Sequence, residues 1–266
     1  MTTKCTPITF LASLDIWVKR DDLYSWAGAN GGKTRGCKAV IDNYYETKPN
    51  KFFEKHMPLT GLITSGSRHS PQIGIVAKIA SHLKLKCRCH TSYGEPGIGI
   101  RIAKRLGAEI IQHRPGYNSV IIQRAIKDST DCGPGWLNIP FGMESQKCIE
   151  ATSLQFKGIP GKVKRIVIVV GSGLSLAGIL HGMTHEKRLI PVLGIIVGAK
   201  PHWRLDRYAP SWWRKMVKLE TSEIPYGKKL EAILDDIQLH STYEAKCLPY
   251  LQRGDLFWIV GGPDNE

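Results

Sequence analysis

Short apolar runs alternate with amphipathic stretches along most of the chain, and this alternation predicts β-strands separated by α-helices. The clearest buried strand is expected within 162–173, where the apolar run IVIVV leads into Gly-Ser-Gly. Further strands are expected at 61–66, 85–91, 108–111, 188–199 and 255–262, and helices at 71–83, 97–106, 174–185 and 226–240. Such a pattern predicts an α/β fold with mostly parallel sheets and helices on both faces.

Two of the predicted strand-to-helix turns carry residues suited to bind anions, because ligands of such folds gather at the carboxyl ends of strands. Residues 171–173 read Gly-Ser-Gly, and glycines at the start of a helix let a phosphate approach free backbone N–H groups. The stretch 64–72 offers serine hydroxyls and a helix start that would suit a carboxylate. Either turn could also be a tight connection without a ligand. Ser70 is a good N-cap and Pro71 suits the first helical position.

A third candidate is Lys33, which lies in the glycine-rich stretch 26–36, WAGANGGKTRG. A lysine becomes a nucleophile toward carbonyl groups when burial or neighbouring cations lower its pKa. Arg35 and Lys38 are expected to be such neighbours. Alone, an exposed lysine in a glycine loop is commonplace.

Together these segments resemble the fold type II (tryptophan-synthase-β-like) family of pyridoxal-phosphate enzymes, within it the aminocyclopropane-carboxylate deaminase and D-cysteine desulfhydrase branch. That branch has KRDD/KRED followed by GGNKxRK, and the present chain has VKRDDLYSWAGANGGKTRG at 18–36. The branch's GSGGTLAGL, DPVYEGK and LFIHTGG correspond to GSGLSLAGIL, LHSTYEAK and LFWIVGG here. The segment GSRHSPQ at 66–72 corresponds to its GG-x-Q-S-N-H/Q.

The resemblance implies a two-lobed enzyme, with 1–60 and 150–266 forming a large cofactor-binding lobe and 61–149 a small lobe. It implies that pyridoxal 5′-phosphate forms a Schiff base with Lys33, which also moves the α-proton. Ser70 would meet the substrate carboxylate or donate a proton, Tyr243 would lie over the reacting carbon, and Glu244 would lie near the pyridine nitrogen. The residues implied to bind the cofactor are Lys33, Gly171, Ser172, Gly173, Ser175, Glu244 and Gly261.

Three positions depart from the branch's pattern. Gly32 replaces the asparagine that usually precedes the Schiff-base lysine, Pro71 replaces an asparagine that contacts the cofactor, and Val260 replaces a threonine. The polar surroundings of the cofactor are therefore thinned, which puts the branch's own reactions in doubt.

Charge is the unusual feature of the composition, because 37 Lys and Arg residues stand against 23 Asp and Glu, a net charge of +14. Such an excess favours nucleic acid or other polyanions, although solubility alone would also account for it. Seven scattered cysteines without a CxxC pair argue against structural zinc and disulfides. No apolar run of about 18 residues is present, so no membrane span is expected, and the cytoplasm (the host's, for a phage protein) fits best.

The basic charge is densest in the segment 200–218, where cations are interleaved with aromatic rings. Cations suit phosphates and flat rings suit bases, so this segment is predicted to contact nucleic acid. At least partial exposure is expected for the adjacent tryptophans. A packed insertion with solvated cations is the alternative. The predicted contact residues are Lys200, Trp203, Arg204, Arg207, Trp212, Trp213, Arg214 and Lys215.

Cofactor motifs and basic charge together suggest a lyase that acts on an α-amino acid attached to a thymine in duplex DNA, most simply by decarboxylation to an amine. Phage enzymes that tailor such thymidines are a known class, and the base would have to flip out of the stack. One alternative is a small-molecule deaminase or desulfhydrase of the parent branch, and another is a catalytically dead DNA-binding scaffold. No bound metal is expected. The protein is expected to form a homodimer.

Overall fold

The computed structural model describes residues 5–47 and 57–263, which form two compact units. The large unit comprises residues 5–24, 30–35 and 148–263, and the small unit comprises 25–29, 36–47 and 57–147. Residues 25–29, 36–47 and 57–60, expected in the large lobe, thus belong to the small unit, and residues 148–149, expected in the small lobe, belong to the large unit. The outermost positions of the expected lobes, 1–4 and 264–266, and the stretch 48–56 lie outside the described residues.

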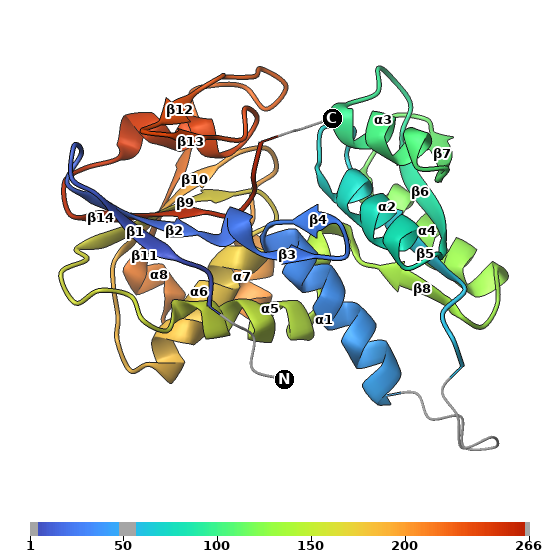
Figure 1. Ribbon diagram of the computed structural model, residues 1–266, viewed down its shortest axis with the longest axis horizontal. Helices are drawn as coiled ribbons and strands as arrows, with labels where there is room; N and C mark the ends of the chain where they lie inside the picture. Colours follow the sequence, from blue (N-terminus) through green and yellow to red (C-terminus); the bar gives the residue numbers. More distant parts are fainter. Residues whose placement is uncertain (1–4, 48–56, 264–266) are drawn as a thin grey trace. The chain divides into compact units, whose positions relative to one another are not determined.

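The large unit is built on a six-stranded sheet with the strand order β1-β2-β14-β9-β10-β11 (Figure 1). Its strands are β1 (Ile8–Leu11), β2 (Ile16–Arg20), β9 (Arg165–Val170), β10 (Val192–Ile196), β11 (Val217–Thr221) and β14 (Asp255–Ile259). All neighbouring pairs are parallel except β1 with β2. The expected strands at 162–173, 188–199 and 255–262 are present with narrower limits, and the mostly parallel α/β fold is confirmed.

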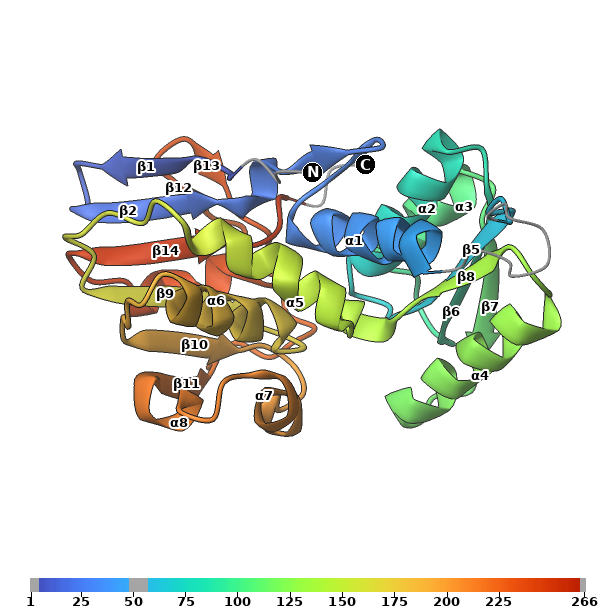
Figure 2. The ribbon, with the colours of Figure 1, turned by 90° about the horizontal axis from the view of Figure 1, so that it is seen from below.

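Successive residues of the central strand β9 face opposite sides of this sheet, and each side has its own core. Ile166 and Ile168 pack with α6 (Leu174–His185), α7 (His202–Tyr208) and α8 (Trp213–Met216). Val167 and Val169 pack with the short strands β12 (Ile233–Leu234) and β13 (Ile237–Gln238) and with the 3₁₀ helix η4 (Glu244–Tyr250). Figures 1 and 2 show the helices and the β12–β13 hairpin on opposite sides of the sheet.

The prediction of a helix at 226–240 is wrong, because this stretch contains the β12–β13 hairpin. Leu234 pairs with Ile237 across a two-residue turn, and Asp235 there has a φ of 58°. Aspartate tolerates this left-handed conformation better than most residues, which makes Asp-Asp a workable turn. Leu234, Ile237 and Leu239 are buried against the sheet.

The small unit has a four-stranded parallel sheet with the order β7-β6-β5-β8. The strands are β5 (Gly61–Ser65), β6 (Lys86–Ser92), β7 (Glu109–His113) and β8 (Trp136–Ile139). Cys89 packs in the core with α2 (Gln72–His82) and α3 (Ile98–Arg105). Its neighbour His90 faces α4 (Asn118–Asp131) instead, so the helices cover both faces of this sheet as predicted.

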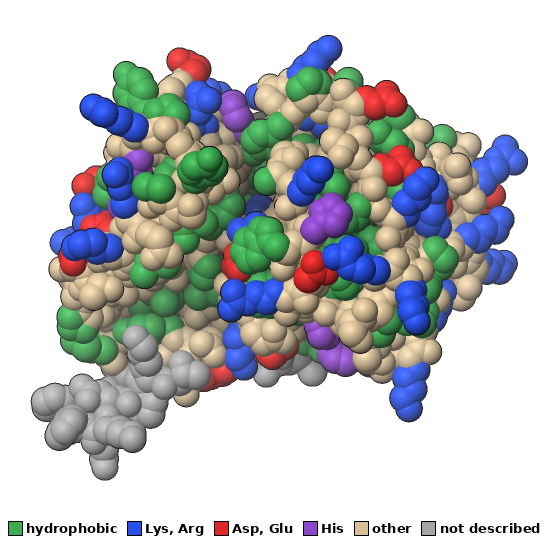
Figure 3. All heavy atoms as spheres, turned by 180° about the vertical axis from the view of Figure 1, so that it is seen from behind, with side chains coloured by type: hydrophobic (Ala, Val, Ile, Leu, Met, Phe, Trp, Pro, Cys, Tyr) green, Lys and Arg blue, Asp and Glu red, His purple; other side chains and the backbone are tan. Residues whose placement is uncertain are grey.

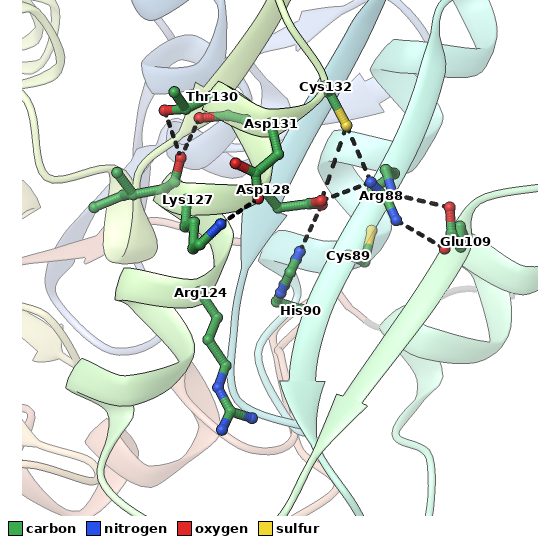
Figure 4. A network of polar contacts seen from close by, with 12 residues as sticks. Arg88, Cys89, His90, Glu109, Arg124, Lys127, Asp128, Thr130, Asp131 and Cys132 are labelled. Carbon is green, nitrogen blue, oxygen red and sulfur yellow. Dashed lines mark hydrogen bonds and ion pairs between the residues drawn. The ribbon is translucent and has the colours of Figure 1, made fainter.

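Polar contacts tie β6, β7 and α4 together in the small unit (Figure 4). His90 Nε2 lies 3.0 Å from Asp128 Oδ2, and the Arg88 guanidinium bonds Asp128 at 2.6 Å. His90 Nδ1 lies 2.9 Å from His113 Nε2, and Arg124 lies 2.8 Å from His113 Nδ1. With both imidazoles neutral, every contact in this series has one donor and one acceptor.

The remaining elements are short except for α1. Within the described residues, no helix is both long enough and apolar enough to cross a bilayer. The other elements are β3 (Ser25–Trp26), β4 (Ala29–Asn30), α1 (Gly32–Thr47), α5 (Gln146–Ser153) and the 3₁₀ helices η1 (Asp21–Leu23), η2 (Phe141–Met143) and η3 (Leu154–Phe156).

Candidate active site

Lys33 is the second residue of α1, and two glycines before it anchor the start of this helix to the large sheet. The N–H of Gly32 donates to the Val260 carbonyl oxygen at 2.8 Å, directly after β14. A Cβ on Gly32 would lie 3.1 Å from Val260 Cγ1 and 3.2 Å from Asp21 Oδ2. Two of the three departures from the branch's pattern, Gly32 and Val260, are therefore packed against each other.

Lys33 is half-buried, and the loss of water around its ammonium lowers its pKa to about 8. Cys148 and Glu244 act in the opposite direction, and Arg204 lowers the pKa further. The expectation that Arg35 and Lys38 supply this effect is wrong. Each is bound to its own carboxylate at 2.6 Å, Arg35 to Asp21 and Lys38 to Asp42.

Glu244 begins η4 and is buried, with one carboxylate oxygen bound and the other available. Oε1 accepts hydrogen bonds from the backbone N–H groups of Val260 at 3.2 Å and Gly261 at 3.0 Å. Oε2 is buried and has no hydrogen-bond partner among the described residues. Burial raises the pKa of Glu244. A buried acceptor of this kind is costly unless a donor group reaches it.

The Gly171-Ser172-Gly173 turn joins β9 to α6, as the sequence predicts. Gly173 caps α6 with a φ of 89°, a conformation that glycine adopts without strain, and a Cβ there would lie 3.0 Å from Pro201 Cβ. A Cβ on Gly171 would lie 3.6 Å from Tyr243 Cε1, so the turn adjoins that aromatic ring. Ser172 and Ser175 are half-buried at the same end of α6.

Tyr226 is a neighbour of Tyr243 that the sequence reading missed. The two hydroxyl oxygens lie 2.9 Å apart, and either hydroxyl could donate. The ammonium of Lys246, buried by η4, donates to the carbonyl oxygens of Pro225 at 2.8 Å and Tyr226 at 3.2 Å. The Pro-Tyr-Gly sequence at 225–227 is a turn signal that argued against a helix starting there.

Ser70 belongs to the small unit and lies in the turn between β5 and α2. Its hydroxyl accepts from the N–H of Gln72 at 3.3 Å, and the N-cap position of α2 is Pro71, one residue later than expected. The buried Gln72 side chain bonds Thr64 at 3.0 Å and the carbonyl of Pro140 at 2.8 Å, so it fixes this turn to the sheet. The large unit thus brings together Lys33, Tyr243, Glu244, Gly261 and the 171–175 segment, and the small unit holds Ser70.

The basic aromatic segment 200–218 is packed more tightly than predicted. Trp213 is 5% exposed in the core beneath α6, and its indole N–H donates to Asp206 at 3.1 Å. Its selection as a nucleic-acid contact is wrong, because a buried ring cannot stack on a base. Trp212 is half-buried on the same core, and Arg204 is 9% exposed.

Trp203, at 52% exposure, is the one predicted contact tryptophan that is largely open to solvent. Lys200, Arg207, Arg214 and Lys215 are exposed as well, although Arg214 pairs with Asp206 at 2.8 Å. Figure 3 shows Lys and Arg side chains dispersed over the drawn face, with acidic groups between them, and not gathered in one stripe.

Comparison with known proteins identifies the fold. No known family model matches the chain. The structure aligns with an aminocyclopropane-carboxylate (ACC) deaminase homologue with a TM-score of 0.79 at 22% identity, covering 98% of this chain and 90% of that one. It aligns with Escherichia coli diaminopropionate ammonia lyase with a TM-score of 0.70 at 12% identity, covering 99% and 84%. The chain has the fold of the type II pyridoxal-phosphate enzymes.

Sequence relatives agree with this fold. The chain is 27% identical over 233 residues to a probable 1-aminocyclopropane-1-carboxylate deaminase of Schizosaccharomyces pombe, covering 74% of this chain and 63% of that protein. It is 24% identical over 212 residues to the 1-aminocyclopropane-1-carboxylate deaminase of Pseudomonas syringae pv. tomato, covering 71% and 58%. The matched part therefore spans less than two thirds of the curated relatives. A further structural neighbour is a pyridoxal 5′-phosphate-dependent aspartate racemase, with a TM-score of 0.54 at 15% identity, covering 96% of this chain and 74% of that one.

Proposed function

We propose that this chain is a pyridoxal-phosphate-dependent lyase that acts on a small α-amino acid, with a reaction of the deaminase type. The observation that carries this proposal is the large unit's pairing of a low-pKa lysine, Lys33, with a buried carboxylate, Glu244, whose Oε2 has no partner among the described residues. The names of the relatives support the deaminase reaction.

The residues of the large unit fit the cofactor group by group. The Gly171-Ser172-Gly173 turn at the start of α6 offers backbone N–H groups and a positive helix end to a phosphate. Glu244 Oε2 would accept a hydrogen bond from a protonated pyridine nitrogen. Lys33 would hold the aldehyde carbon. Bound pyridoxal phosphate supplies an electron sink for the bonds of the substrate's α-carbon.

Lys33 has the protonation behaviour that this role requires. With a pKa of about 8, roughly one lysine in ten is neutral at pH 7, compared with about one in three thousand at the ordinary value of 10.5. A neutral amine can attack a carbonyl, and the same amine can afterwards take a proton from the α-carbon and return it.

The hydroxyl of Tyr243 can donate a proton at the site in addition to the proton that Lys33 moves. The hydroxyls of Tyr243 and Tyr226 are 2.9 Å apart, so a proton given up by Tyr243 leaves an oxygen that Tyr226 stabilises with a hydrogen bond. Ser70 keeps its proposed role at the substrate carboxylate, on the turn that Gln72 fixes in the small unit.

The test is cofactor binding followed by turnover. Addition of pyridoxal phosphate should produce a visible absorbance band, and borohydride reduction should attach the cofactor mass to Lys33. Lys33→Ala should lose both, whereas Lys38→Ala, five residues further along α1, should keep both. Release of ammonia from 1-aminocyclopropane-1-carboxylate, or of sulfide from D-cysteine, would support the deaminase type. Absence of any band in the wild-type protein would refute the proposal and favour a dead scaffold.

A second candidate function uses the same cofactor on a different substrate. The substrate is an α-amino acid that is already attached to a thymine in duplex DNA, and the reaction is its decarboxylation to an amine. The net charge of +14 and the exposed Lys200, Arg207 and Lys215 favour it. Mass spectrometry of nucleosides from amino-acid-modified DNA should then show the loss of one carbon dioxide. Duplex affinity that does not fall with added salt would refute it. A homodimer remains a prediction for sedimentation to check.

A further inference from the structure

Arg204 differs from the other cations of the segment 200–218 because it is buried. Its side chain is 9% exposed, whereas Lys200 and Arg207 are exposed. Its guanidinium carbon lies 4.2 Å from the centre of the Trp203 ring. Trp203 is the exposed member of this stacked pair, so it covers the guanidinium from solvent on one side.

The helix that carries Arg204 is fixed beside the Gly171-Ser172-Gly173 turn. A Cβ on Gly173 would lie 3.0 Å from Pro201 Cβ and 3.5 Å from Leu205 Cγ. Leu205, the residue after Arg204, is fully buried in the core that it shares with α6. These contacts hold α7 against the same helix start that offers its N–H groups to a phosphate.

Arg204 is also within electrostatic reach of Lys33, whose pKa it lowers. The buried guanidinium, on a helix packed against this turn, and the positive end of α6 therefore both add positive potential beside it. A phosphate dianion is stabilised in such a place, and a guanidinium binds phosphate oxygens with two parallel hydrogen bonds.

We propose that Arg204 binds the phosphate of pyridoxal phosphate at the Gly171-Ser172-Gly173 turn, so that a residue of the basic segment serves the cofactor and not a nucleic acid. This inference rests on the proposed cofactor. It assigns α7 to the binding site and explains why one arginine of this segment is buried while its neighbours are exposed.

The test compares two ligands that differ only in the phosphate. Dissociation constants of pyridoxal phosphate and of pyridoxal are measured by absorbance titration for the wild type, Arg204→Gln and Arg204→Lys. Arg204→Gln should weaken pyridoxal phosphate by about 10- to 100-fold more than pyridoxal, because both ligands lose the effect of Arg204 on the pKa of Lys33 but only pyridoxal phosphate loses a phosphate contact. Arg204→Lys, which keeps the charge but not the fork, should fall between the two. Arg207→Gln removes an exposed arginine from the same helix and should change neither constant.

Several outcomes would overturn the inference, and they are distinguishable. Equal weakening of both ligands would mean that Arg204 acts only through Lys33 or through folding, which thermal melts of each variant would reveal. An unchanged affinity for pyridoxal phosphate with a raised KM for the amino acid would place Arg204 at a substrate carboxylate. If Arg204→Gln weakened only the affinity for duplex DNA, Arg204 would be a nucleic-acid contact. Failure of the wild type to bind either ligand would instead refute the proposed function itself.

Discussion

The buried ion pair between Arg35 and Asp21 allows a stability prediction of known sign and size. Both terminal guanidinium nitrogens of Arg35, Nη1 and Nη2, bond the Asp21 carboxylate at 2.6 Å, and both side chains are almost completely buried. In Arg35→Met, Asp21 would keep only Thr6 at 3.1 Å and the Trp258 indole at 3.3 Å as side-chain hydrogen-bond donors, with Lys19 as a nearby charge.

The expected loss follows from the two lost bonds. Hydrogen bonds to charged groups contribute about 1.5–3 kcal/mol each, and removing one partner of a buried pair costs about 3–5 kcal/mol. We therefore expect Arg35→Met to lower the free energy of unfolding by about 3–5 kcal/mol and the melting temperature by about 6–20 °C. Lys38→Met, which breaks the more exposed pair with Asp42, should cost about 0.5 kcal/mol or less.

The pH dependence gives an independent check. Burial alone would raise the pKa of Asp21, but the Arg35 guanidinium holds it below the ordinary value. The stability that this pair contributes is present above about pH 4 and is lost as the pH falls further. Without Arg35, burial dominates and Asp21 takes up a proton more readily, so the gap between wild type and Arg35→Met should narrow toward acid. Chemical denaturation followed by tryptophan fluorescence measures both quantities. A loss no larger than that of Lys38→Met, or a gap that widens toward acid, would refute the reasoning.

Three further changes test the sites described above. Tyr226→Phe keeps the ring and removes one hydroxyl, so kcat should fall about tenfold or more at unchanged melting temperature; an unchanged kcat would remove Tyr226 from the proton path. Gly32→Asn should lower the free energy of unfolding by about 1–3 kcal/mol, because the new side chain meets a Val260 methyl group. Adding Val260→Thr should recover part of this loss. Additive losses in chemical denaturation would show that the two positions are independent. Burial and the neighbouring His90 lower the pKa of His113. The contribution of neutral His113 to the free energy of unfolding should therefore be fully present above about pH 6.5 and should be lost as the pH falls. His113→Gln should flatten that slope in melts across this range, and an unchanged slope would exclude His113 as its source.

Strands β5, β9, β10 and β14 were predictable because they are buried almost throughout and three of them are continuous apolar runs. The parallel strands β2, β8 and β11 were not among the expected strands, because half-buried and polar residues interrupt any such run. Residues 226–240 show the limit of such reading. Leu230, Ile233, Leu234 and Ile237 have the spacing of a helical face. The last three instead lie in the β12–β13 hairpin, where Leu234 and Ile237 pack on the large sheet and Ile233 is exposed. The spacing of apolar residues does not show which surface they pack against. Here packing against the large sheet, and not the spacing, determines the local structure.

The site was predictable only as far as the resemblance carried it. The motifs predicted Lys33, Glu244 and the glycine turn as site residues, but not the residues that surround them. Proximity in the sequence suggested Arg35 and Lys38 as the cations near Lys33. The structure instead pairs Arg35 with Asp21 and Lys38 with Asp42, and Arg204 is within electrostatic reach of the lysine. Charge and aromatic content are the same for an exposed side chain and a buried one, so burial could not be read from them.

The position of β14 in the large sheet has a consequence for how the protein is made. This last strand lies between β2, from the beginning of the chain, and β9. The small unit's sheet uses only strands between residues 61 and 139, so all of it leaves the ribosome more than a hundred residues before β14 does. The large sheet stays open until residue 259 has been synthesised, because its two halves meet only through β14. Removal of β14 would therefore separate β2, which precedes Lys33, from β9, which leads to the Gly171-Ser172-Gly173 turn, so the proposed cofactor site cannot form until residue 259 has been synthesised.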